Sequence, residues 1–282
     1  MHNDNKNYME VNKMQFGMPT LIENKNLDET AKLCKELGLD FIELNMNLLQ
    51  YQIEYLEKTD EFLKIAEQYG IFYTIHLDEN LNFCDFNRAV SEAYSDTVKR
   101  TIDVAKILKV PTINMHMNKG VYFSLPDKKI YLFEKYNSKY MSDIKNFKEL
   151  CNEAIADSEI KISIENTDGY MKYEKDAIEY LLQSRIFSLT WDIGHSHTAN
   201  NIDEPFILKH ANRLNHFHIH DADGKNNHLT LGSGQINLKD RVKIAEEYDC
   251  RCVIETKTIE ALRKSVKFIE RYLDFAPNKN EI

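Results

Sequence analysis

The sequence predicts a closed (β/α)8 barrel, a TIM barrel, for this chain of 282 residues. Short segments typical of β-strands recur eight times, and amphipathic segments typical of helices lie between them. This alternation is typical of a parallel sheet that closes on itself inside a ring of helices. A doubly wound open sheet is the alternative, but no G-x-G-x-x-G follows the first strand, so a dinucleotide-binding fold has no support.

Most of the expected strands are rich in Ile, Phe, Val and Thr and are bounded by turn residues. They are 14–18, 41–45, 72–77, 112–117, 161–166, 188–193, 214–220 and 250–256. Helical periodicity is clearest in 27–37, which Gly38 would terminate, and in 91–108 and 259–273. We therefore expect one barrel over 14–274, with a polar N-terminal tail at 1–13 and a C-terminal tail at 275–282.

The longest interval between two expected strands contains a segment that is not helical. Residues 120–133 alternate apolar and polar around a Pro-Asp-Lys-Lys turn, which predicts a β-hairpin insertion after strand four. The insertion follows the C-terminal end of a barrel strand, where barrel enzymes keep their sites. We expect it to cover the site and to contribute aromatic side chains such as Tyr122 or Phe123.

Composition narrows the class of protein. No stretch approaches the roughly 18 apolar residues of a membrane span, and the first 13 residues lack the apolar segment of a signal peptide. The five cysteines include no C-x-x-C pair, which favours reduced, mostly buried thiols in a cytoplasmic protein. A net charge of −9 disfavours nucleic acid as a partner, since such proteins usually carry a basic surface.

Six of the eight expected strands end in imidazole or carboxylate side chains, which barrel closure would bring around one axis. The strand-end residues are His76, Asp78, His116, Glu165, Asp192, His195, His218, His220 and Glu255. Any one of them alone is more simply explained as a packed histidine or a rim ion pair. Taken together they would be costly to bury, and a divalent cation offsets that cost. Mixed His and carboxylate ligands suit zinc or manganese.

Strand seven carries His216, His218 and His220, which alternate and so face one side of the strand. They cannot all reach one metal ion. We expect His216, the deepest, to be a packed structural residue. His220, the nearest to the loop, is expected to support a ligand or to contact substrate.

An ordered set of motifs gives a resemblance to a known family. The motifs are HLD (76–78), NMHMN (114–118), IENTDG (164–169), WDIGH (191–195), HIHDADG (218–224), HLTLGSG (228–234) and IET (254–256). Together, over about 14–274, they resemble the xylose-isomerase-like TIM-barrel superfamily. This superfamily includes sugar and sugar-phosphate isomerases and epimerases, and AP endonucleases of the endonuclease IV type.

The isomerase branch implies a single-metal site. Its four ligands fall on Glu165, Asp192, His218 and Glu255, with Zn²⁺ or Mn²⁺ as the cation, and its substrate-contacting histidine falls on His195. The endonuclease branch implies a three-zinc cluster. Its further ligand positions fall on His76, His116, His195, Asn226 and His228. The nuclease has Asp in place of Asn226 and Pro in place of Lys257.

Two classes of function follow. The first is a metal-dependent isomerase or epimerase acting on a sugar or sugar phosphate through an enediolate, with Glu165 and Glu255 as the proton-transfer pair. The alternative is a multinuclear-zinc phosphodiesterase resembling AP endonuclease; a binding barrel without catalysis has no positive feature. His76, His116, His195 and His228 are expected to contact substrate or a second metal.

Two further features bear on the substrate. His220 and Lys257 are candidate substrate contacts, although Lys257 could equally form a surface ion pair. The loop 232–234, Gly-Ser-Gly, would either bind a substrate phosphate through its N–H groups or form a tight turn. We favour the isomerase class with a small carbohydrate substrate, and a homo-oligomer is left open.

Overall fold

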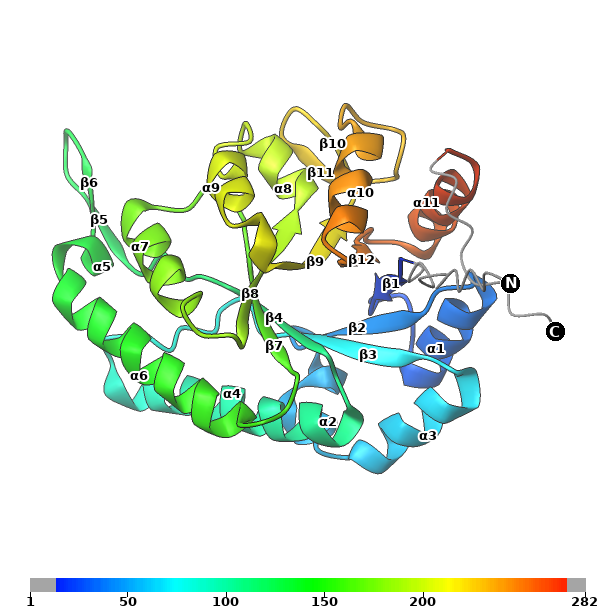
Figure 1. Ribbon diagram of the computed structural model, residues 1–282, viewed down its shortest axis with the longest axis horizontal. Helices are drawn as coiled ribbons and strands as arrows, with labels where there is room; N and C mark the ends of the chain where they lie inside the picture. Colours follow the sequence, from blue (N-terminus) through cyan, green and yellow to red (C-terminus); the bar gives the residue numbers. More distant parts are fainter. Residues whose placement is uncertain (1–13, 273–282) are drawn as a thin grey trace, which may run out of the picture.

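The computed structural model describes residues 14–272. The expected tails 1–13 and 275–282, with the end of the last expected helix, lie outside the described residues. Eight parallel strands form a closed barrel, and helices surround it (Figure 1). The predicted TIM barrel is therefore confirmed, and the open doubly wound sheet is excluded. Around the barrel the strand order is β1, β12, β9, β8, β7, β4, β3 and β2.

The barrel strands are short and mostly buried. They are β1 (Phe16–Pro19), β2 (Phe41–Asn45), β3 (Phe72–His76), β4 (Thr112–His116), β7 (Lys161–Glu165), β8 (Phe187–Asp192), β9 (Leu214–Ile219) and β12 (Arg251–Ile254). Several end before the sequence pattern predicts, because the chain leaves the ladder as it enters the loop. Glu255 is the first residue after β12, and its N–H still bonds the Ile219 carbonyl at 3.0 Å.

Helices follow the strands and cover the outside of the barrel. They are α1 (Leu27–Glu36), α2 (Ile53–Leu56), α3 (Thr59–Tyr69), α4 (Arg88–Leu108), α5 (Leu132–Lys135), α6 (Asn137–Ile155), α7 (Lys172–Leu181), α8 (Ile193–Thr198), α9 (Glu204–Lys209), α10 (Leu238–Glu247) and α11 (Ile259–Tyr272), with 3-10 turns at Leu49–Tyr51 and Ala211–Arg213. The three helices singled out in the sequence are α1, α4 and α11. Their apolar faces bury against the strands, as their periodicity predicts.

Two hairpins extend the barrel at the C-terminal ends of its strands. The predicted insertion forms β5 (Tyr122–Ser124) and β6 (Lys129–Tyr131), paired antiparallel. In Figure 1 it projects beyond α5 at the edge of the molecule. The second hairpin, β10 (Asp221–Asp223) with β11 (Asn226–Leu229), follows β9 and was not predicted.

Many large apolar side chains and the cysteines are buried, as the composition predicts. Large side chains such as Trp191, Phe217 and Phe41 are fully buried. All five cysteines are free and buried, as predicted. Within residues 14–272 no helix has the length and apolar character needed to cross a membrane.

A buried carboxyl in the first turn of α7 makes stability depend on pH. Glu174 Oε2 accepts the N–H of Met171 at 2.7 Å, and burial raises the pKa of Glu174 from 4.5 to about 7. The folded chain therefore holds this proton more tightly than the unfolded chain. The resulting stabilisation is present below about pH 4.5 and is lost as the pH rises through about 7, a change of at most roughly 3 kcal/mol.

We expect Glu174→Gln to remove this dependence, because glutamine keeps the acceptor oxygen and cannot ionise. Urea unfolding at about pH 5 and about pH 8 should show the free energy of unfolding of the variant gaining on that of wild type as the pH rises. The difference between the two proteins isolates this carboxyl, since other groups titrate in both. A difference that stays constant over this range would contradict the raised pKa.

Candidate active site

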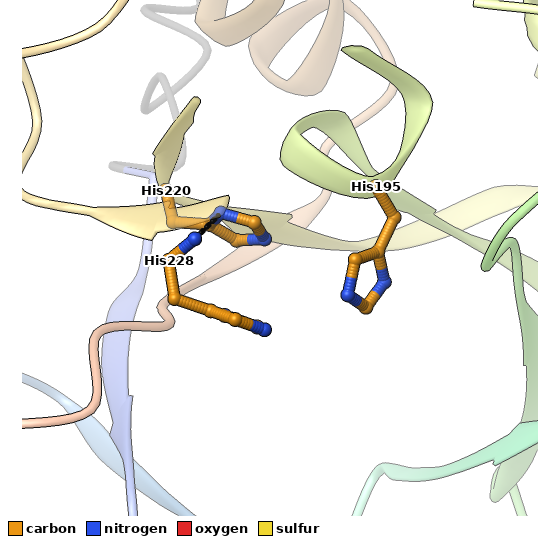
Figure 2. Close-up of side chains that lie close together, drawn as sticks. All are labelled: His195, His220 and His228. Carbon is orange, nitrogen blue, oxygen red and sulfur yellow. Dashed lines mark hydrogen bonds between the residues drawn. The ribbon is translucent and has the colours of Figure 1, made fainter. Parts of the chain in front are cut away.

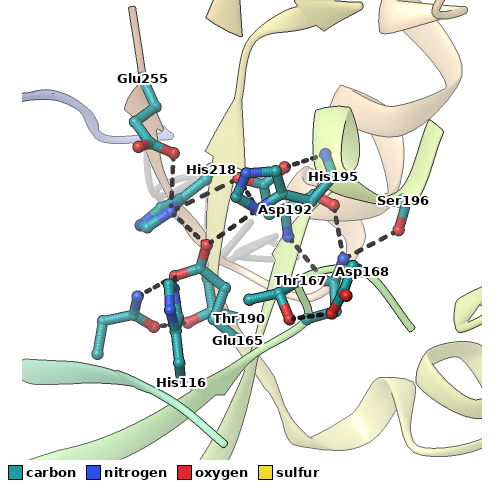
Figure 3. A network of polar contacts seen from close by, with 12 residues as sticks. His116, Glu165, Thr167, Asp168, Thr190, Asp192, His195, Ser196, His218 and Glu255 are labelled. Carbon is teal, nitrogen blue, oxygen red and sulfur yellow. Dashed lines mark hydrogen bonds and ion pairs between the residues drawn. The ribbon is translucent and has the colours of Figure 1, made fainter. Parts of the chain in front are cut away.

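Four predicted ligands from four strand ends converge at the C-terminal mouth of the barrel (Figure 3). One atom from each of Glu165, Asp192, His218 and Glu255 lies within 4.8 Å of the others. We call these four residues the quartet. His218 Nδ1 is 3.2 Å from Glu165 Oε1, 3.2 Å from Glu255 Oε2 and 3.9 Å from Asp192 Oδ2.

The quartet has the donor set and the unsatisfied atoms of a divalent-cation site. His218 Nδ1 and Glu255 Oε2 are buried and lack a hydrogen bond of good geometry. Zinc binds His and carboxylate ligands at about 2.0–2.2 Å, which puts ligand atoms roughly 3–4.5 Å apart. The separations in the quartet are close to these, so the residues fit such an ion.

His218 offsets part of the negative charge within the quartet. Burial opposes ionisation of Glu165, but the charges of His218 and His116 outweigh it and hold its pKa well below the usual range. Burial likewise opposes ionisation of Glu255, whose pKa is held low chiefly by His218. Burial lowers the pKa of His218, but Glu165 and Glu43 raise it well above its ordinary value. A cation would therefore bind two carboxylates that are already ionised, and it would displace a proton from His218.

A carboxylate that the sequence analysis missed lies behind His218. Glu43 of β2 is 2% exposed, and its Oε1 lies 2.8 Å from His218 Nε2. Its Oε2 lies 2.9 Å from His216 Nε2 and accepts a hydrogen bond from the Thr74 hydroxyl at 3.1 Å. Metal-ligating histidines commonly direct their second nitrogen at a carboxylate in this way. The available signal was a charged residue inside the apolar segment FIELN. His216 is fully buried beside Phe41, the structural position expected of it.

His76 and His116 contact Oε2 of Glu165, whereas His218 contacts Oε1. His76 and His116 each place Nε2 at 3.3 Å from Glu165 Oε2, and together with Glu165 they form a second group of possible metal ligands. Burial lowers the pKa of His76, but the hydrogen bond and charge of Glu165 outweigh it and raise the pKa to about 9. Asn114 of β4 also donates to Glu165 Oε2. Its side chain is a further contact that the sequence analysis did not single out.

Three histidines, His195, His220 and His228, lie close together, as Figure 2 shows, and two of them contact Asp192. His195 lies in α8, with its Nδ1 3.3 Å from Asp192 Oδ2, while His220 is fully buried and its Nε2 lies 3.0 Å from Asp192 Oδ1. His228 stacks on the His220 ring with centroids 4.2 Å apart. Burial lowers the pKa of His228 to about 4, so this imidazole is neutral near pH 7.

A cavity of about 390 Å³ opens above the quartet. It is lined by Asn45, His76, Glu79, His116, Glu165, Thr167, His195, His228, Glu255 and Lys257. No described residue of the β5–β6 hairpin lines it. The expectation that Tyr122 or Phe123 covers the site is therefore wrong for this structure. The hairpin strands pair with each other, and the side chains of Tyr122 and Phe123 are exposed.

The remaining candidates fall outside the quartet. Asn226 is exposed opposite Asp223 in the β10–β11 hairpin and does not line the cavity. Lys257 does line it, with Nζ 2.9 Å from Glu255 Oε1. His220 does not line it, so its predicted substrate contact has no support in this geometry.

The loop 232–234 is a tight turn around Asp221. The N–H groups of Gly232 and Gly234 donate to Asp221 Oδ2 at 3.0 and 2.8 Å, and that of Ile236 donates to Oδ1 at 3.1 Å. These groups are already paired, so they are not available to a substrate phosphate.

Comparison with known proteins agrees with this architecture. The family model described as xylose isomerase-like TIM barrel matches residues 31–272. The chain belongs to this family. The resemblance seen in the sequence motifs is thereby confirmed. The fold that the family's description names, a TIM barrel, is the one described above.

Individual relatives span nearly the whole chain. The uncharacterized protein MJ1614 of Methanocaldococcus jannaschii is 27% identical over 278 residues, covering 93% of this chain and 97% of the relative. A D-tagatose 3-epimerase-like protein has a TM-score of 0.73 at 24% identity, covering 93% and 97% of the two chains. The 3-keto-D-glucoside 4-epimerase YcjR of E. coli has a TM-score of 0.71 at 14% identity, covering 92% and 99%. At these identities the structural likeness shows the fold alone.

Proposed function

We propose that this protein is a metal-dependent sugar isomerase or epimerase that moves a proton between two carbons of a ketose. The observation that carries the proposal is the pair Glu165 and Glu255, each with an oxygen 3.2 Å from the same His218 nitrogen. In Figure 3 the two carboxylates approach this nitrogen from different directions. Two carboxylates around one cation-binding point suit removal of a proton by one and its return by the other.

The roles of the residues follow from their positions. Glu165, Asp192, His218 and Glu255 would hold a divalent cation, Zn²⁺ or Mn²⁺. When bound, such an ion polarises the substrate carbonyl and stabilises enediolate charge. Glu165 and Glu255 line the cavity and are ionised, so either can accept a proton from a bound sugar. His76, His116, His195 and His228 line the walls as partners for substrate hydroxyls.

The charges around the cavity favour a neutral sugar over a sugar phosphate. Lys257 is the one Lys or Arg among the described lining residues, and it is paired with Glu255. Glu79 adds a further carboxylate to the same wall. In the 232–234 turn the N–H groups of Gly232 and Gly234 are bound to Asp221, and that of Ser233 is bound to the Thr230 carbonyl. The described lining of the cavity therefore offers no unpaired Lys or Arg side chain to bind a substrate phosphate.

The alternative is a multinuclear-zinc phosphodiesterase resembling AP endonuclease. The grouping of His76, His116 and Glu165 favours it, because these three side chains could hold a second metal ion. The position of Asn226, away from the cavity, and the net charge of −9 weigh against it.

One set of measurements tests the proposal. The purified protein should contain about one divalent ion per chain, and chelation should abolish turnover. Incubation of the metal-loaded protein in D₂O with a panel of ketoses and ketose phosphates should put deuterium into a neutral ketose, because an enediolate exchanges its proton with solvent. Two or more ions per chain, with cleavage of abasic-site DNA and no exchange into any sugar, would replace the proposal with the alternative. Exchange only into phosphorylated sugars would contradict the neutral substrate.

A further inference from the structure

His220 is a buried histidine that neither lines the cavity nor belongs to the quartet. We propose that it is a positioning residue: it holds the Asp192 carboxylate in the orientation that a bound cation requires. The inference rests on the proposed metal site at the quartet and adds to that site a residue that acts through Asp192.

Hydrogen bonds fix which nitrogen of His220 carries the proton. The backbone N–H of His228 donates to His220 Nδ1 at 2.7 Å, as the dashed line in Figure 2 shows. A nitrogen that accepts a hydrogen bond carries no proton. Nδ1 also lies 3.4 Å from the Asp221 carbonyl oxygen, but the contact with the His228 N–H is much shorter and its donor is unambiguous, so in the neutral ring the proton is on Nε2. His220 Nε2 lies 3.0 Å from Asp192 Oδ1 and 3.1 Å from Oδ2, and it therefore donates to this carboxylate.

The second contact of Asp192 completes its orientation. Asp192 is the N-cap of α8, and its Oδ1 accepts the N–H of His195 at 2.6 Å. Oδ2 lies 3.9 Å from His218 Nδ1. The helix start and His220 thus hold the carboxylate from the protein side and direct Oδ2 toward the quartet. Second-shell hydrogen bonds of this kind commonly tune metal affinity.

The surrounding backbone is shaped to hold the ring of His220. A Cβ on Gly194 would lie 1.9 Å from His220 Cε1, so only glycine leaves space for the imidazole there. His228, whose N–H is the donor, has a φ of 53°, in the left-handed region that non-glycine residues rarely adopt. Such a conformation costs of order 1 kcal/mol and persists where the surroundings impose it. The hydrogen bond to His220 and the stacking of the two rings account for it here.

Two substitutions separate the two nitrogens. Asparagine places its amide near the position of Nδ1, so His220→Asn keeps an acceptor for His228 and loses the donor to Asp192. Glutamine reaches the position of Nε2, so His220→Gln keeps a donor to Asp192. The matched controls are His210→Asn and His210→Gln, at a histidine whose Nε2 lies 3.1 Å from Glu179 on another part of the surface.

The experiment titrates the metal-free proteins with Mn²⁺ and follows free Mn²⁺ by electron paramagnetic resonance. We expect His220→Asn to lose about 10–100-fold in affinity, while His220→Gln and both controls stay within about threefold of wild type. Melting of each metal-free protein is measured on the same samples. Equal affinity in wild type and His220→Asn, or an equal loss in His220→Gln, would overturn the inference. Absence of Mn²⁺ binding by wild type would instead overturn the proposed function.

A measurement on the wild-type protein decides the matter should a variant fail to fold. Nitrogen NMR of histidine-labelled, metal-loaded protein distinguishes a protonated ring nitrogen from an unprotonated one. We expect His220 to carry its proton on Nε2 alone. A proton on Nδ1 would contradict the hydrogen bond from His228 and with it the inference.

Discussion

Glu255→Gln is expected to reduce sugar turnover by about 10²–10⁴-fold even at saturating metal, because the proposed proton carrier is lost. The substitution also removes a negative ligand, so the affinity for the cation should fall as well. Glutamine has nearly the same shape as glutamate, so the barrel should remain folded. Deuterium exchange from D₂O into the ketose, measured at several metal concentrations, separates the two effects.

The control for this variant is Glu260→Gln on the surface of α11. Glu260 pairs with Lys264 at 2.6 Å, and both side chains are exposed. We expect it to leave turnover unchanged. Metal content has to be measured on the same samples, because metal loss alone would slow the reaction. Full turnover by Glu255→Gln once metal is restored would show that Glu255 serves only as a ligand, and the proton-transfer pair would have to be reassigned.

Glu43→Ala is expected to destabilise the metal-free protein by roughly 3–5 kcal/mol, because it removes one partner of a buried charge network. His216 and His218 would remain buried with no carboxylate between them. Burial opposes ionisation of Glu43, but the charge of His218 and the hydrogen bond of His216 outweigh it and hold its pKa below the usual range. This carboxylate is therefore charged in the folded protein, and the loss should be seen near neutral pH as a lower midpoint of urea unfolding.

A surface ion pair provides the comparison. Glu36 lies 3.0 Å from Arg263, with both side chains about half exposed, and Glu36→Ala should cost no more than about 1 kcal/mol. Glu43→Gln should fall between the two, because its amide keeps one oxygen for the histidines but loses the charge. If Glu43→Ala unfolded at the same urea concentration as Glu36→Ala, the network would not contribute to stability.

The barrel could be predicted from the strand pattern of the sequence, and the family resemblance singled out the four quartet residues among those at the strand ends. Each barrel strand is a local segment with its own apolar pattern, and parallel strands in a closed sheet all end at the same mouth. Glu165, Asp192 and His218 lie at the ends of their strands, and Glu255 follows the last strand directly. Their convergence therefore follows from the fold class alone. Their roles as ligands and proton carriers remain predictions.

Contacts between distant strands could not be predicted in this way. Glu43 meets His216, which lies 173 positions later in the chain, because β2 and β9 face each other across the barrel interior. The sequence shows a carboxylate in an apolar strand but not its partners. Asn114 reaches Glu165 across 51 positions because β4 and β7 are neighbouring strands of the barrel, although they are far apart in the chain.

For the loops, too, local pairing could be predicted from the sequence and the placement in the fold could not. The alternation of 120–133 predicts a hairpin correctly, because pairing between adjacent strands is a local property. Where the hairpin lies relative to the cavity is a tertiary property, and none of its described residues lines the cavity, so the expectation that it covers the cavity fails. The sequence by itself determined the eight barrel strands, the helices α1, α4 and α11 and the residues at the mouth of the barrel. Only the tertiary structure decided that Asp221 occupies the 232–234 turn and that His220 faces Asp192, because a hydrogen bond depends on where two separately folded segments meet.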